Sequence, residues 1–332
     1  MLSKSQDGFI RRTSAFYNSI KGNGLFITLV MIVYRLIFHK ALNPVALRMI
    51  REERLINYLN KYQKAIDLGY KESFKSNDLG QDLKKVVWTY WAQGASDMPV
   101  IVERCIESQK IVIGQMEGWR HIVLSDNDLD RYVKIPPYIK KKYKKGIIST
   151  THYSDILRYT LISRYGGIWL DATVYLTAGN SAPLNIEMVS EQELFFVQMP
   201  LNVPQIRIAG SWIIKSNRNN PIILAVRDML YEYWKKENYI RDYFLVDVCV
   251  AYVLQKHEEF HDMWDRIPYF DGSNSHRLDK ALNEKYIEER WISILESTCI
   301  HKLSWKDVYK EEDAKGKTFY RTLIDNNIDS IG

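Results

Sequence analysis

The residue types best suited to chemistry stand close together near the middle of the chain. Asp155 and Arg158 lie three positions apart in a stretch of helical character, Thr150 to Tyr165, which Gly166-Gly167 ends. On a helix these two side chains share a face. Alone, such a pair is typical of a surface ion pair worth about 0.3–0.5 kcal/mol, so further residues must decide whether it serves a ligand.

The run that follows adds a carboxylate on a strand. We expect a strand over Ile168–Leu176, with Asp171 at its centre. Its alternation places one set of side chains on a single face: Trp169, Asp171, Thr173 and Tyr175. An aspartate in an apolar strand is costly to bury unpaired, so Asp171 should meet a cation, a ligand or the end of the strand. Helix, Gly-Gly turn and Asp-bearing strand together form a constellation more specific than any of its parts.

Strands and helices alternate around this constellation. Strands are expected over residues 86–88 and 120–124, and helices over residues 99–108 and 150–165. Alternation of this kind predicts an α/β fold with a largely parallel sheet. Ligands bind beyond the carboxyl ends of the strands in such sheets, where Trp91, Asp126 and Asp171 fall.

Composition excludes several classes of protein. The chain has 332 residues, of which 46% are hydrophobic and 26% charged, as in ordinary globular proteins and unlike disordered, collagen-like or polytopic membrane chains. Its net charge of +6 is spread thinly, so we expect no nucleic-acid partner. Three distant cysteines form no CxxC motif, which argues against a disulfide scaffold or a zinc ribbon and suits a reducing compartment.

The first 80 residues differ from the rest. Leu25–Phe38 is apolar apart from Arg35, but it falls short of the roughly 20 residues needed to cross a bilayer. Basic residues flank it, which leaves two interpretations open: a core helix, or a helix that lies on an anionic membrane surface. Lys71–Gln81 is typical of a linker.

The constellation resembles that of the capsular polysaccharide synthesis proteins, which are related to the family 32 glycosyltransferases and the glucosylating clostridial toxins. The matching motifs are Ser154-Asp155-x-x-Arg158, Gly166-Gly167 and Asp171. The resemblance implies a GT-A-like (Rossmann-like) α/β domain that binds a nucleotide sugar. It divides the chain into an N-terminal helical region with a linker (1–80), the GT-A-like domain (81–305) and a C-terminal tail (306–332).

The resemblance also implies roles for single residues. In such enzymes aromatic residues of the first strand pack against the nucleotide base, and the helical Asp and Arg hold ribose and sugar. A strand-end Asp-x-Asp joins a divalent cation to the diphosphate, whereas Thr173 replaces the second Asp here. The implied donor-binding residues are Tyr90, Trp91, Asp155, Arg158, Asp171 and Lys302. The implied cofactor is Mn²⁺ or Mg²⁺, with Asp171 and His301 as metal ligands.

The implied reaction transfers a sugar from a nucleotide diphosphate donor to a hydroxyl of a growing capsular or exopolysaccharide unit, lipid-linked and with retention of configuration. Asp171 and Asp247 are the candidate catalytic residues. Apolar neighbours of Asp247 favour a raised pKa, which suits a base or orienting group for the acceptor. The expected location is cytoplasmic, at the inner face of the cell membrane, where an anionic surface is a further expected partner.

Two other classes of function stay open. His257-Glu258-Glu259-Phe260-His261 fits the H-E-x-x-H pattern of a zinc hydrolase, although its charged surroundings favour a solvated helix end. Thr173 in place of a carboxylate also allows a non-catalytic subunit that binds a nucleotide sugar.

Overall fold

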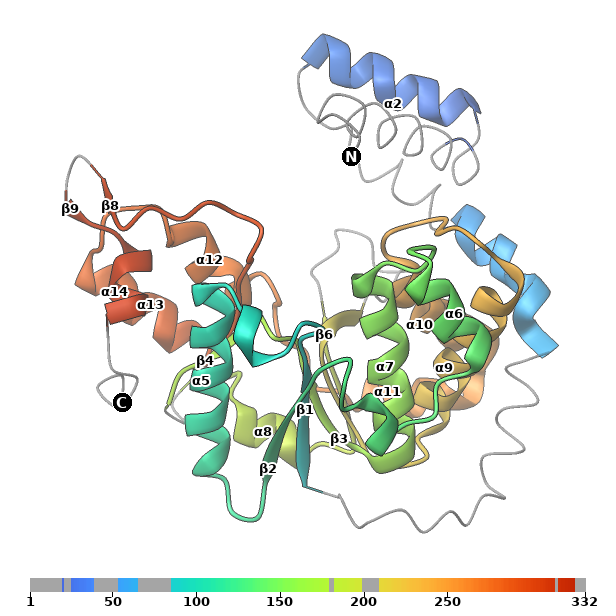
Figure 1. Ribbon diagram of the computed structural model, residues 1–332, viewed down its shortest axis with the longest axis horizontal. Helices are drawn as coiled ribbons and strands as arrows, with labels where there is room; N and C mark the ends of the chain where they lie inside the picture. The colour runs from blue at the N-terminus through green and yellow to red at the C-terminus, as the bar shows by residue number, and fades with distance from the viewer. Residues whose placement is uncertain are drawn as a thin grey trace.

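A mixed five-stranded sheet forms the centre of the protein in a computed structural model (Figure 1). Its strands lie in the order β2-β1-β3-β6-β5. β1 is parallel to β2 and β3, and β6 is antiparallel to β3 and β5, so four of the five strands point the same way. The predicted α/β class with a largely parallel sheet is confirmed. The strands are β1 Val86–Tyr90, β2 Arg120–Leu124, β3 Gly167–Leu170, β5 Leu194–Gln198 and β6 Ala209–Ser216.

The structure describes residues 20, 25–38, 53–64, 85–178, 182–198, 209–313 and 316–325. The expected linker Lys71–Gln81 lies outside them. The longer helices of the described body are α5 Val100–Gly114, α6 Pro137–Lys144, α7 Thr150–Tyr165, α9 Pro221–Lys236, α10 Leu245–Lys256 and α13 Glu288–Ser297. The shorter ones are α8 Ile186–Glu191, α11 His261–Asp265 and α12 Arg277–Ala281.

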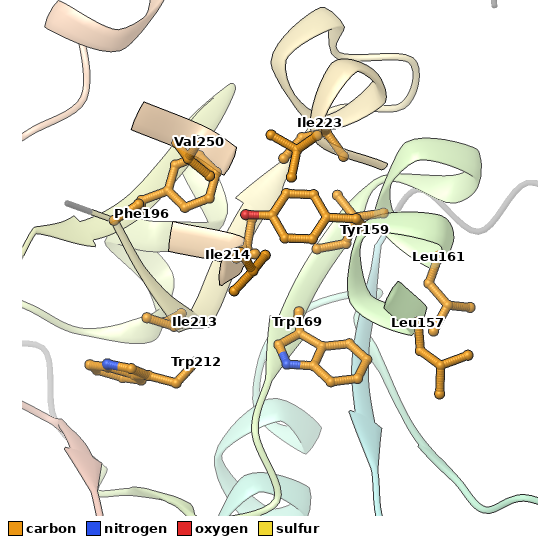
Figure 2. Close-up of a cluster of buried hydrophobic side chains, with 14 of the residues drawn as sticks. Leu157, Tyr159, Leu161, Trp169, Phe196, Trp212, Ile213, Ile214, Ile223 and Val250 are labelled. Carbon is orange, nitrogen blue, oxygen red and sulfur yellow. The ribbon is translucent and has the colours of Figure 1, made fainter. Parts of the chain in front are cut away.

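Helices cover both faces of the sheet (Figure 1). α7 and α10 contact β6 on one face, with α9 packed on both of them, and α5 contacts β2 from the other side. Figure 2 shows the resulting core, where Tyr159 of α7, Trp169 of β3 and Ile214 of β6 meet. These three side chains are completely buried. Burial of this kind holds the start of α7 against the carboxyl end of β3.

The strand expected over Ile168–Leu176 is in fact two strands in different sheets. β3 ends at Leu170, and β4 (Val174–Leu176) pairs with β7 (Ile300–Lys302) in a separate two-stranded sheet. A turn between them is closed by the Val174 N–H, which donates to the Asp171 carbonyl at 2.9 Å. The predicted alternation across Asp171 is therefore wrong, because the chain changes direction there. Of the three surroundings expected for Asp171, the structure shows two, because it follows the end of β3 and faces the cations of Arg158 and Lys302.

The Gly-Gly turn before β3 is a steric requirement. Gly166 and Gly167 have φ of 72° and 92°, the left-handed region that L side chains rarely adopt. A Cβ on Gly167 would lie 2.2 Å from the carbonyl oxygen of Val86, the first residue of β1. Glycine at this position thus lets β3 pair with β1 and brings Asp171 to the edge where β1 also ends.

Segments near both ends of the chain pack onto this body. Residues 53–59 are helical, and Leu59 and Tyr62 are buried, with the Tyr62 ring 5.8 Å from that of Tyr233 in α9. Near the other end, α14 (Phe319–Asp325) packs against α5 and buries Phe319. The region expected as a tail from residue 306 therefore includes a packed helix, preceded by the short strands β8 Glu312–Asp313 and β9 Gly316–Lys317.

The apolar stretch near the start of the chain forms α2 (Leu25–Phe38). Seven of its large apolar side chains are exposed: Leu25, Phe26, Leu29, Val30, Ile32, Val33 and Leu36. None of the helices in the described ranges is long and apolar enough to span a bilayer.

Candidate active site

A cavity of about 520 Å³ opens at the carboxyl ends of β1 and β3. Its walls come from six parts of the chain: the end of β1, the first turns of α7, the turn after β3, the segment before α10 that carries Tyr243, the helical segment around His276, and β7 with the loop that follows. Of the donor-binding residues predicted from sequence, five line it: Tyr90, Trp91, Arg158, Asp171 and Lys302. The predicted position of the site, beyond the strand ends, matches the place of this cavity.

Arg158 is the centre of a buried ion network. Its Nη2 lies 3.2 Å from Asp155 Oδ1 and 3.1 Å from Asp171 Oδ1, and its Nη1 donates to the Ser211 carbonyl. Burial alone would lower the pKa of Arg158, but the carboxylates of Asp171 and Asp155 raise it above the usual value. The guanidinium is therefore a fixed positive charge at the cavity wall, 5.2 Å from the ring centre of Trp169.

Asp155 lies behind this network and does not line the cavity. Only 8% of its side chain is exposed. Burial raises the pKa of Asp155, and the positive charges of Arg158 and His152 offset this only in part. This buried placement suits a residue that positions Arg158. It differs from the direct contact with the donor that was expected from the sequence.

Lys302 brings a second positive charge to the cavity. It stands on β7, opposite Val174 of β4, so the pairing of these strands carries it to the turn after β3. Its Nζ donates to Thr173 Oγ1 and lies 3.5 Å from Asp171 Oδ2. The other oxygen of Asp171 accepts from the indole Nε1 of Trp169 at 2.9 Å. Both oxygens of the Asp171 carboxylate thus face donors or cations.

Aromatic side chains form another part of the wall. The rings of Trp91 and Trp305 meet edge to face, with centroids 5.6 Å apart, and Tyr243, about half exposed, also lines the cavity. Tyr90 is held by a 2.6 Å hydrogen bond from its hydroxyl to Asp126 Oδ1. Such a wall offers the face of a single aromatic ring to a planar or sugar ring.

Comparison with known proteins places the chain in a family. Residues 38–323 match the family described as "Capsular polysaccharide synthesis protein". The chain belongs to this family. The match includes every residue that lines the cavity and begins at the last residue of α2.

Two individual proteins are also similar. "O-glycosyltransferase PaGT" of Phomopsis amygdali is 30% identical over 103 residues, which are 29% of this chain and 25% of that protein, so the chain spans about a quarter of its relative's length. The solved "PaToxG Glycosyltransferase" is 13% identical and superimposes with a TM-score of 0.35, covering 65% of this chain and 83% of that one.

The structure does not bring His301 to the cavity of this capsular polysaccharide synthesis family protein. His301 precedes Lys302 on β7, so its side chain points to the opposite side, where it is completely buried beside Tyr175. Its Nε2 lies 3.4 Å from Thr177 Oγ1. Burial lowers the pKa of His301 to about 3. A shared metal ligand role with Asp171, as expected from sequence, does not fit this placement.

Asp247, the other predicted catalytic residue, does not line the cavity either. It lies in the first turn of α10, with 9% of its surface exposed. Its charge acts on Tyr159 and Cys249, and the pKa values of both groups are raised, first by burial and then by Asp247. In this structure Asp247 lies in the helix layer that packs against β6 of the sheet.

The residues present do not fit a divalent cation held by the protein. Across the described part of the chain, no three His, Cys, Asp or Glu side chains are grouped so that they could hold a metal ion. Asp171 alone offers a carboxylate where the motif expects two, and Arg158 and Lys302 already face it. A hard cation requires several anionic or neutral oxygen ligands, and adjacent positive charges repel it.

The H-E-x-x-H segment does not form a zinc site. α10 ends at Lys256, a 3-10 turn covers Glu258–Phe260, and α11 begins at His261, so no single helix carries both histidines. His261 Nε2 lies 2.7 Å from the Leu254 carbonyl oxygen, so it donates to this carbonyl and is not available to bind zinc. The zinc hydrolase alternative therefore has no structural support.

Several cavity residues were missed from the sequence. Asp279 comes from a helical segment more than a hundred residues after Asp171, and Tyr243 precedes α10; nothing local marks either residue. Asp279 Oδ1 accepts the Ser304 N–H at 2.9 Å and thereby fixes the loop that bears Trp305. Burial, and then the nearby Lys302, lower the pKa of His276, so its ring is neutral near pH 7.

Proposed function

We propose that the protein is a glycosyltransferase with a GT-A-like site. It would move a hexose from a nucleotide diphosphate sugar to a hydroxyl of a growing, lipid-linked capsular or exopolysaccharide unit. One observation carries the proposal: Arg158, Asp171 and Lys302 converge on a cavity that also has an aromatic wall. Family membership and the named activity of the relative from Phomopsis amygdali support sugar transfer. Retention of configuration rests on the sequence resemblance alone.

Each part of such a donor has a matching surface. The base would pack against Trp91 and Trp305, whose rings line the cavity. The diphosphate would accept hydrogen bonds from Lys302, and the sugar hydroxyls would face Asp171 and Arg158. A cavity of about 520 Å³ is within the usual range for a ligand of this size.

The chemistry asked of these residues is charge stabilisation. The bond between the anomeric carbon and the diphosphate oxygen breaks, and its electron pair leaves with the diphosphate. The acceptor oxygen bonds to the anomeric carbon, and its proton passes to water or to the departing diphosphate. Lys302 and Arg158 would stabilise the negative charge on the leaving group.

Binding of nucleotides tests the proposal. Thermal shifts with a panel of nucleotide diphosphate sugars should reveal a donor that raises the midpoint, since a ligand specific for the folded state stabilises it. Asp171→Asn should remove most of this shift, and His257→Ala, outside the cavity, should leave it unchanged. No shift with any member of the panel would contradict the proposal. Hydrolysis of the donor without acceptor would separate a transferase from a non-catalytic binding subunit.

We further propose that the enzyme works at the cytoplasmic face of the cell membrane, on an anionic lipid surface. α2 exposes its apolar side chains on one broad face, as an interfacial helix requires. Residues 8–51 contain no Asp or Glu. Their basic residues are Arg11, Arg12, Lys21, Arg35, Lys40, Arg48 and Arg51. Such a segment is attracted to anionic headgroups, where a lipid-linked acceptor would be found.

A further inference from the structure

The ammonium group of Lys302 contacts both positions of the altered Asp-x-Asp motif, Asp171 and Thr173. Lys302 Nζ donates to Thr173 Oγ1 and lies 3.5 Å from Asp171 Oδ2, and all three residues line the cavity. We propose that Lys302 takes the place of the divalent cation, so that the protein binds the diphosphate of its donor without metal. This inference rests on the function proposed above.

The backbone fixes Lys302 in this position. Lys302 pairs with Val174 in the β4–β7 sheet, and the next N–H, that of Leu303, donates to the Thr173 carbonyl at 2.9 Å. Only 19% of the Lys302 side chain is exposed. A lysine whose backbone pairs with β4 and whose ammonium contacts Thr173 and Asp171 loses little further freedom when a ligand arrives, so its charge is preorganised.

The same arrangement disfavours a metal ion. Asp171 Oδ1 already faces Trp169 Nε1 and Arg158 Nη2, at 2.9 and 3.1 Å. A cation at the remaining oxygen would stand beside the Lys302 ammonium, with only a neutral hydroxyl at the second motif position. Charges of the same sign repel strongly in a site shielded from water. The three N–H donors of the ammonium face Thr173 Oγ1, Asp171 Oδ2 and, at 3.5 Å, the Leu303 carbonyl oxygen, so a phosphate oxygen would replace this last, long hydrogen bond.

The net charge of the side chains that line the cavity suits an anionic ligand that carries no metal ion. Its cationic side chains are Arg158, Lys302 and Lys306, and its carboxylates are Asp171 and Asp279, which leaves 3 − 2 = +1 among the described lining residues. A diphosphate therefore meets an excess of positive charge without any added cation.

Calorimetry in EDTA and in Mg²⁺ tests this inference. The probes are UDP, GDP, ADP and CDP, with inorganic pyrophosphate as a probe independent of the base. At least one nucleotide should bind in EDTA with an affinity within about threefold of that in Mg²⁺, because protein groups hold the phosphates. Lys302→Met should weaken binding in EDTA by about tenfold or more, the loss of a charge-assisted hydrogen bond. Lys302→Arg should retain most of it.

Lys280→Met is the matched control, since it removes an equal charge on α12, outside the lining, and should change affinity by less than about twofold. Thr173→Asp combined with Lys302→Met supplies two carboxylates and no ammonium. This variant should bind Mn²⁺, seen by electron paramagnetic resonance of the free ion, and its nucleotide binding should depend on metal. Circular dichroism melts establish that each variant is folded.

The outcomes separate this inference from the proposed function. Wild-type binding that disappears in EDTA and returns with Mg²⁺ would overturn the role of Lys302 and leave the glycosyltransferase standing. An unchanged affinity of Lys302→Met in EDTA would overturn it as well. Failure of every nucleotide diphosphate to bind in either buffer would contradict both proposals.

Discussion

At the scale of single residues, Arg158 forms ion pairs with both carboxylates of the site, Asp155 and Asp171. It stands between Asp155 and Asp171, so one carboxylate is held inside the protein while the other faces the cavity. The i, i+3 spacing of Asp155 and Arg158 predicted their contact correctly. The spacing could not show that Asp155 is buried, because burial depends on packing with elements far away in the sequence, such as α9, which packs on α7.

His301 gives a prediction about acid stability. Its ordinary pKa near 6.5 applies to the unfolded chain, whereas burial lowers it to about 3 in the folded protein. Between pH 6.5 and about 3 the unfolded state therefore binds a proton at His301 that the folded state does not bind. The free energy of unfolding present above pH 6.5 is lost as the pH falls. The loss should be about 1.4 kcal/mol for each pH unit below 6.5.

Urea unfolding at a series of pH values between 7 and 5 measures this loss. His301→Gln should flatten the profile, since the substituted side chain does not titrate, even if its stability at pH 7 is lower. His257→Gln controls for the removal of a histidine elsewhere in the chain. His121, whose pKa burial lowers to about 4, should account for part of the slope that remains. A slope that His301→Gln leaves unchanged would refute the prediction.

At the scale of elements, the turn between α7 and β3 decides the position of the site. We predict that Gly167→Ala disrupts the pairing of β1 with β3, because a Cβ there lies 2.2 Å from a backbone oxygen at a φ of 92°. The expected cost is about 3 kcal/mol or more, since neither strand can yield without losing sheet hydrogen bonds. Nucleotide affinity should fall as well, because Asp171 follows four residues later.

Gly114→Ala, at the end of α5, is the matched control. A Cβ there meets nothing within 4 Å, so this change should be neutral or should stabilise the fold by up to about 1 kcal/mol. Denaturant midpoints of the two variants provide the comparison. If Gly167→Ala were as stable as Gly114→Ala, the steric account of the turn would be wrong.

The elements themselves could largely be predicted from sequence, and their pairing could not. The strand over residues 120–124 and the helix over residues 150–165 have the predicted bounds. The break at Asp171 was missed, because apolar residues continue through it and only the pairing of β4 with β7 redirects the chain. For the same reason alternation could not say which of His301 and Lys302 faces the cavity.

At the scale of the whole molecule, α2 should govern attachment to a membrane. We predict that Phe26→Glu combined with Leu36→Glu releases the full-length protein from vesicles that contain phosphatidylserine. The two side chains are 78% and 70% exposed, and a charge on this face opposes insertion. Cosedimentation with vesicles measures binding, and nucleotide affinity should stay at the wild-type value.

Val308→Glu is the control, because that side chain is 83% exposed but lies far from α2 in the sequence. It should sediment with anionic vesicles as the wild type does. Vesicles of phosphatidylcholine alone should bind all three proteins weakly, since they lack the negative charge that attracts the basic segment. Equal sedimentation of the double variant and the wild type would rule out α2 as the attachment helix.

The contact between Thr173 and Lys302 also sets an order of events during synthesis. These residues are 129 positions apart, and a ribosome that adds about 5–20 residues per second needs roughly 6–26 s to pass from one to the other. Until then β4 has no partner strand, and its open edge is a surface for wrong pairing. A truncated translation product that stops before β7 would therefore be prone to aggregate.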